Sequence, residues 1–71
     1  DIPLIAEHFL QLLNSANGTD KRWSAGALEQ LARREWRGNA RELRNAVHRA
    51  YILADDELRA EDTVSTQERT P

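Results

Sequence analysis

Apolar residues in the first part of the chain recur at steps of three and four, the spacing of one buried face of an α-helix. The members of this stripe are Leu4, Ile5, Phe9, Leu12, Leu13 and Ala16. Asp1 is placed to cap the helix, and Pro3 falls in its opening turn, where a missing N–H costs nothing. Because Asn17-Gly18 is a strong stop signal, we predict a helix that ends at about residues 14 to 15.

The same periodicity predicts two further helices. Ser24 is placed to cap the second, which has Gly26 in its first turn, continues to Glu35 and is closed by Trp36. The third is predicted to run from about Ala40 to Ala54, with one stripe of apolar positions facing the core. That buried stripe contains Leu43, Ala46, Val47, Ala50, Tyr51 and Ala54, and a separate polar stripe contains Arg41, Arg44 and His48.

The pattern therefore predicts an all-α fold, a small bundle of three main helices without a sheet. Residues 60–62 are expected to begin a short fourth helix, and Arg33 and Arg34 to remain solvated off the apolar stripe. Residues 1–62 form the predicted helical domain. Residues 63–71 are polar and are predicted to be a disordered linker.

Composition narrows the possible function classes. The 71 residues suffice for one small domain, and 39% apolar residues allow a modest core. The absence of cysteine excludes a disulfide framework or a thiolate metal site, and no other cluster of metal ligands is visible. Apolar stretches are far shorter than the roughly 20 residues of a membrane span, so no membrane partner is expected. The chain starts without a basic leader or an initiator Met, which predicts a piece of a larger cytoplasmic protein.

Charge is distributed unevenly along the chain. Positions 21 to 49 hold eight Lys or Arg residues against three Glu, whereas positions 55 to 62 hold five acidic residues against Arg59 alone. This pattern fits either an anionic partner at the centre of the chain or an ordinary solvated surface.

The most informative stretch is Trp36–Asn45, which reads as a tight turn opening into a helix. Gly38 is suited to the positive φ that ends a helix, and Asn39 is a good N-cap. Glu42 follows three residues later, which makes a variant of the capping box. Arg41 is unusual, because a cation in the first turn opposes the helix dipole. Either Arg41 points into water, or it faces an anion together with the free N–H groups of the helix N-terminus.

No phosphate-binding loop of the form G-x-x-x-x-G-K-[ST] occurs in the chain, and no pattern of nucleophile and base is recognisable. We therefore expect no catalytic residue and no catalysis by this chain alone.

The stretch W-R-G-N-A-R-E-L-R-N resembles the W-P-G-N-V-R-E-L-x-N signature of bacterial enhancer-binding proteins, the sigma-54-dependent transcriptional activators. The opening D-I-P-L with E-H-F-L, the segment S-A-G-A-L and the segment R-A-Y-I-L-A resemble further motifs of that family in the same order. The resemblance covers residues 1–62. Two departures stand out: Arg37 replaces the usual Pro, and Ala40 replaces a usual Val or Ile.

The resemblance implies that the chain is the helical lid of an AAA+ ATPase domain. It implies that Arg41 is the sensor II residue that contacts the γ-phosphate of ATP, with Ala40 near the nucleotide and Ile2 near the adenine. The Mg²⁺ would be held by the missing large subdomain of the same protein. The other implied partners are neighbouring subunits of a homo-oligomeric ring, the sigma-54 RNA polymerase holoenzyme, and DNA through a separate C-terminal domain.

Two alternatives from other classes stay open at this stage. The helices that flank Trp36–Asn39, with Arg41, Arg44 and His48 on the second, superficially fit a DNA-binding helix-turn-helix. The overall acidity of the chain opposes that interpretation. The other alternative is a purely structural helical module that only mediates contacts.

Overall fold

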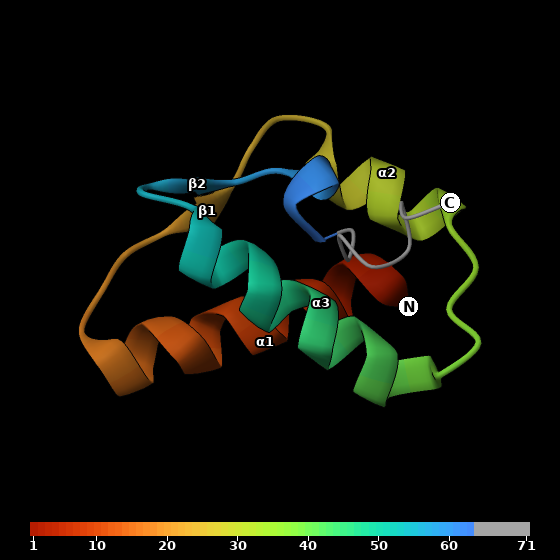
Figure 1. Cartoon of the computed structure of the whole chain (residues 1–71), viewed down its shortest axis with the longest axis horizontal. Coiled ribbons are helices and arrows are strands. Elements are labelled where there is room, and N and C mark those ends of the chain that lie inside the picture. Colours follow the sequence, from red (N-terminus) through yellow and green to blue (C-terminus); the bar gives the residue numbers. More distant parts are fainter. Residues whose placement is uncertain (64–71) are drawn as a thin grey trace, which may run out of the picture.

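The computed structural model describes residues 1–63 of the chain, the side chain of Asn39 excepted. Figure 1 shows a small helical domain, as the sequence predicts. Its elements are α1 (Ile2–Asn17), β1 (Arg22–Trp23), α2 (Ala27–Arg33), α3 (Asn39–Leu53), β2 (Glu57–Leu58) and the 3-10 helix η1 (Ala60–Thr63). Within these residues, no helix is long and apolar enough to cross a membrane.

The ends of α1 follow from its capping residues. Asp1 caps the helix, its Oδ1 accepting a hydrogen bond from the Leu4 N–H at 3.3 Å, and Pro3 lies in the first turn. Gly18 adopts the left-handed conformation with φ 68°, and its N–H donates to the carbonyl of Asn14. The predicted start and stop signals are confirmed, but the helix continues to Asn17 because the chain leaves the helix only at this glycine.

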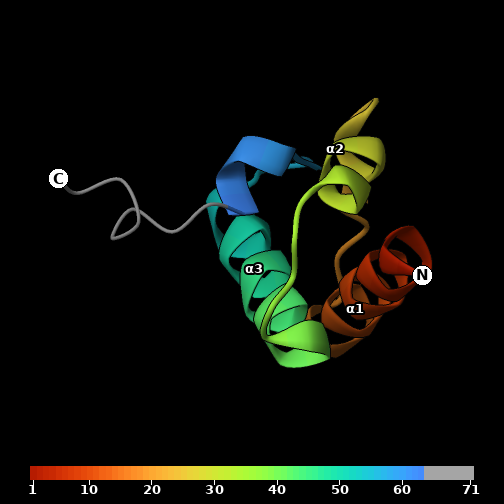
Figure 2. The same cartoon turned by 90° about the vertical axis from the view of Figure 1, so that its right-hand side faces the viewer.

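The core is built on α3, whose predicted stripe is buried throughout. Figure 2 shows α2 and η1 on the same side of the pair formed by α1 and α3. The centre of the buried face of α1 is formed by Ala6 and Leu10, at 0% and 1% exposure. Leu4 and Leu12 of the predicted stripe are instead 70% and 53% exposed. The apolar arc of α1 is wider than the surface that α2 and α3 cover, so its spacing does not reveal which side faces inward.

A two-residue parallel ladder corrects the prediction of a domain without a sheet. Arg22 pairs with Glu57 and Trp23 with Leu58. The ladder joins the loop after α1 to the loop after α3 and brings the Leu58 side chain into the core at 0% exposure. Strands of two residues carry no alternating pattern, so the sequence gives no signal for them.

The second helix is shorter than predicted at both ends. It begins after Gly26, which occupies the N-cap position with φ 80°, so the assignment of Ser24 as the cap is wrong. Ser24 instead donates its N–H to the Leu58 carbonyl at 2.8 Å, beside the ladder. At the other end, the helix stops at Arg33, and the indole Nε1 of Trp36 folds back to donate to the Leu31 carbonyl at 2.8 Å.

Thr63 ties η1 to the rest of the domain. Its hydroxyl accepts a hydrogen bond from Arg34 Nη1 at 2.6 Å, and its carbonyl accepts one from Arg49 Nη2 at 2.9 Å. Thr63 is fully buried and belongs to η1, although the sequence pattern places it in the linker. Arg34 is half-buried and stacks 4.5 Å from the Trp36 ring, which corrects its prediction as a solvated side chain. The predicted linker residues 64–71 lie outside the described residues.

Lys21 caps the C-terminal end of α3, a contact that the sequence does not indicate. Its Nζ donates to the carbonyls of Tyr51 and Ala54 at 2.9 and 2.8 Å and lies 4.1 Å from the centre of the Tyr51 ring. Asn14 holds the loop in place, since its Oδ1 accepts from the Lys21 N–H at 3.0 Å and its Nδ2 donates to the Lys21 carbonyl at 2.8 Å. The loop after α1 thus neutralises the negative end of the α3 dipole.

Replacing Lys21 with Met is expected to destabilise the domain by about 1–2 kcal/mol, because two charge-assisted hydrogen bonds and a cation–π contact are lost. Urea unfolding followed by circular dichroism measures this change. Arg33→Met is the matched control, since the Arg33 side chain is exposed and takes part in neither ion pair found among residues 1–63. Equal unfolding midpoints for the two variants would show that the Lys21 cap does not stabilise the domain.

Candidate functional site

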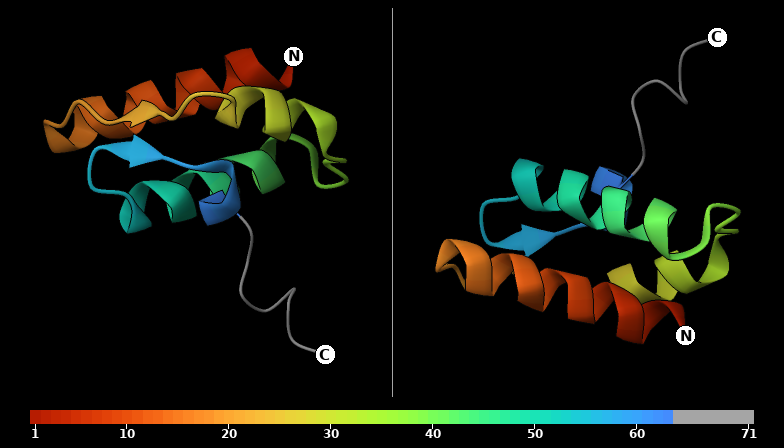
Figure 3. Two further views of the ribbon diagram at one scale, coloured as in Figure 1. Left: turned by 90° about the horizontal axis from the view of Figure 1, so that it is seen from above. Right: turned by 90° about the horizontal axis from the view of Figure 1, so that it is seen from below.

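A groove between α1 and α3 contains the polar stripe predicted from the sequence. Figure 3 shows the two helices side by side and running in the same direction from the end that holds the N-terminus. The groove has a volume of about 600 Å³. Its α1 wall is formed by Phe9, Leu12, Leu13 and Ala16, and its α3 wall by Arg41, Arg44, Asn45 and His48. We call this feature the α1–α3 groove; one of its walls is apolar and the other is polar and basic.

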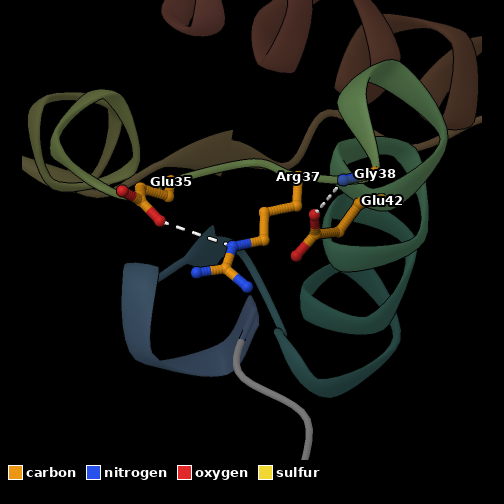
Figure 4. A network of polar contacts seen from close by, with 4 residues as sticks. All are labelled: Glu35, Arg37, Gly38 and Glu42. Atoms are coloured by element: carbon orange, nitrogen blue, oxygen red, sulfur yellow. Dashed lines mark hydrogen bonds and ion pairs between the residues drawn. The ribbon is translucent and has the colours of Figure 1, made fainter.

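The turn before α3 determines where its basic wall begins. The helix starts at Asn39, and Gly38 takes the cap position with φ −83° and without a side-chain cap. The predictions that Gly38 has a positive φ and that Asn39 is the N-cap are therefore both wrong. Glu42 retains its part of the predicted capping box, because its Oε1 accepts a hydrogen bond from the Gly38 N–H at 2.8 Å (Figure 4).

Gly38 is needed in this turn for space rather than for backbone freedom. A Cβ atom built on Gly38 would lie 2.8 Å from the Cβ of Glu42 and 3.3 Å from its Oε1. Contacts this short force a shift of the neighbouring atoms. A side chain at position 38 would thus displace Glu42 from its hydrogen bond.

Arg41 lies at the mouth of the groove in the first turn of α3, and its side chain is exposed. The N–H groups of this first turn have no acceptor within the helix, so they and the guanidinium lie at the same helix end. The ion pairs found among residues 1–63 are Arg22–Glu57 and Arg37–Glu35, and neither involves Arg41 or Arg44. The basic wall is therefore available to an anion.

The structure places the three predicted site residues differently with respect to the groove. Arg41 lines it, whereas Ala40 is exposed on the same turn but does not contribute to the lining. Ile2 is half-buried against the core, seven residues before Phe9 and so about 10 Å further along the α1 axis. Arg41 is thus brought together with Arg44 and His48 and not with Ile2.

Sequence reasoning missed the apolar wall of the groove. Phe9, Leu12, Leu13 and Ala16 were all assigned to the buried face of α1, and their three- and four-residue steps do not distinguish a core face from a groove wall. The pairing of an apolar wall with a basic row suits a ligand that has both apolar and anionic parts. A DNA backbone, which offers mainly phosphates, would leave the apolar wall without a partner. Among the side chains of the described segment, no cluster of three potential metal ligands occurs.

Comparisons with known proteins show the family to which the chain is similar. The family model described as the AAA+ ATPase lid domain matches residues 1–70. The hydrogenase transcriptional regulatory protein HoxA of Bradyrhizobium diazoefficiens is 47% identical over 62 residues, which are 84% of this chain and 13% of that protein. The transcriptional regulatory protein ZraR of Escherichia coli is 44% identical over 62 residues, which are 86% of this chain and 14% of that protein.

A third relative, the nitrogen fixation protein AnfA of Azotobacter vinelandii, is 42% identical over 59 residues, 82% of this chain and 11% of that protein. The chain thus spans between 11% and 14% of the length of these three curated relatives.

Proposed function

Since the chain belongs to the family of AAA+ ATPase lid domains, we propose that it is the lid of a sigma-54-dependent transcriptional regulator in which Arg41 contacts the γ-phosphate of ATP. The observation that carries this proposal is the position of Arg41, exposed in the first turn of α3 and free of ion pairs with the described residues. HoxA and ZraR, which are transcriptional regulatory proteins by name, support the regulatory context.

In the proposed mechanism, Arg41 donates charge-assisted hydrogen bonds to the γ-phosphate while ATP is intact and loses them after hydrolysis. A coupling of about 1–3 kcal/mol between this contact and the lid angle is enough to shift the lid between two orientations. The lid then passes its movement to neighbouring subunits of a homo-oligomeric ring and so to the sigma-54 RNA polymerase holoenzyme. DNA is bound by a separate C-terminal domain, and the protein is cytoplasmic.

The nucleotide and its Mg²⁺ are held mainly by the large subdomain of the same protein, because the chain has no phosphate-binding loop. This chain therefore does not hydrolyse ATP by itself. Ala40 lies beside the nucleotide, since it shares the exposed first turn with Arg41. Ile2 lies near the adenine, at the end of α1 that is nearest to the chain terminus.

A distance measurement in the intact AAA+ protein tests the proposal. One spin label is attached at the exposed position 33 through Arg33→Cys, and another on the subdomain that holds the nucleotide. We expect a shorter distance with a non-hydrolysable ATP analogue than with ADP, and the same distance in both states when Arg41 is replaced by Ala.

Arg44→Ala is the matched control for this measurement, because Arg44 lines the same groove one turn further along α3. This variant is expected to keep the difference between the two nucleotides. A lid distance that is identical with both nucleotides in the unsubstituted protein would contradict the proposed sensing role.

A further inference from the structure

We propose that Glu42 is a positioning residue for Arg41: its bonds to Gly38 hold the turn before α3, in which Arg37 does not fix φ as the Pro of the family signature does. This inference rests on the proposed function, since it concerns how Arg41 is held toward the phosphate. The bonds between Glu42 and the backbone of Gly38 carry it.

Glu42 and Gly38 are joined by two hydrogen bonds that enclose the first turn of α3. The Glu42 carboxylate accepts from the Gly38 N–H at 2.8 Å, and the Glu42 N–H donates to the Gly38 carbonyl at 3.3 Å. Arg41 lies inside the segment that these bonds close. They fix the backbone from which its side chain leaves the helix, and no hydrogen bond or ion pair between Arg41 and Glu42 is needed.

Two other features next to position 38 restrain the turn only weakly in the described part of the chain. Gly38 has no side chain with which to cap the helix. The Arg37–Glu35 ion pair, drawn on the other side of the turn in Figure 4, has a distance of 3.6 Å between side chains that are 91% and 83% exposed. Pairs this exposed contribute little to stability. A proline at position 37 would fix φ near −65°, and Arg37 does not.

Arg41 itself is exposed, so packing does not determine the direction of its side chain. The close approach of Glu42 to Gly38 leaves no room for a Cβ at position 38, so this contact requires glycine there. A flexible first turn would let the guanidinium sample many positions. Small displacements of a catalytic or sensing group lower the reaction rate strongly.

The test uses ATP turnover by the intact AAA+ protein. Glu42→Ala is expected to lower kcat about fivefold, as for the loss of one helix-capping interaction, with little change in KM. Glu42→Gln keeps an oxygen acceptor for the Gly38 N–H and is expected to retain most of the activity. Adding Arg37→Pro to Glu42→Ala is expected to recover part of the loss, because the proline restores a fixed φ.

A double-mutant cycle separates positioning from general damage. If Glu42 acts through Arg41, the variant with both Arg41→Ala and Glu42→Ala turns over ATP at the rate of Arg41→Ala alone. Additive losses, a Gln variant as slow as the Ala variant, or no recovery with Arg37→Pro would each overturn the positioning role. If the Arg41→Ala variant hydrolyses ATP at the unsubstituted rate, the proposed function is wrong. If Arg41→Ala is slow but Glu42→Ala hydrolyses ATP at the unsubstituted rate, only the positioning role is wrong.

Discussion

Replacing Arg41 with Ala in the intact protein is expected to lower ATP turnover on the order of a hundredfold while leaving the lid folded. A guanidinium directed at the γ-phosphate stabilises the charge that develops in the transition state, and removal of one such preorganised donor typically has an effect of this size. The fold should tolerate the change, because Arg41 is exposed and a cation at a helix N-terminus is mildly unfavourable. Steady-state ATP hydrolysis, with a thermal melt of each variant, measures both effects.

Two further variants make this comparison specific. Arg41→Lys should recover only part of the activity, because an ammonium group does not reproduce the bidentate geometry of the guanidinium. Arg44→Ala removes a charge from the same groove but from a position further from the helix N-terminus, so it should lower ATP turnover less than Arg41→Ala does. Hydrolysis at the unsubstituted rate in Arg41→Ala would show that this side chain is merely solvated and would refute the sensor assignment.

The site was only partly predictable from the sequence. The unusual cation in the first helical turn singles out Arg41 but leaves it either solvated or facing an anion, and only the family resemblance assigns it a role. The structure places Arg41 in the groove beside Arg44 and His48. The apolar wall and the reason for Gly38 were not predictable, since both depend on distances between residues of separate turns or helices. A glycine before a helix suggests a positive φ, whereas here its missing Cβ makes room for Glu42.

The same division applies to the fold. The buried stripe of α3 was predicted residue by residue, because a long helix repeats its three- and four-residue spacing several times. The Lys21 cap, the bonds of Thr63 and the β1–β2 ladder join residues far apart in the chain. Each depends on one specific pair of residues, so no periodic pattern in the sequence predicts it. The sequence therefore predicts the helices themselves, but not the contacts that hold them together.

Replacing Leu10 with Ala is expected to lower the stability of the domain strongly. Leu10 is 1% exposed at the centre of the core between α1 and its neighbours, and the shortened side chain would leave a cavity. A buried Leu→Ala change costs about 3 kcal/mol, a large part of the roughly 4–10 kcal/mol that stabilises a domain of this size. The melting temperature should fall by about 12–24 °C.

Leu4→Ala is the matched control, because it makes the same chemical change in the same helix at a residue that is 70% exposed. The loss of buried area is small and alanine favours the helix, so the free energy of unfolding should change by about 0.5 kcal/mol at most. The melting temperature should therefore stay within a few degrees of that of the unsubstituted chain. The pair tests directly which side of α1 faces the core. If Leu4→Ala proved as damaging as Leu10→Ala, the buried face of α1 would have to be centred on the stripe that the spacing alone predicts, and not on Ala6 and Leu10.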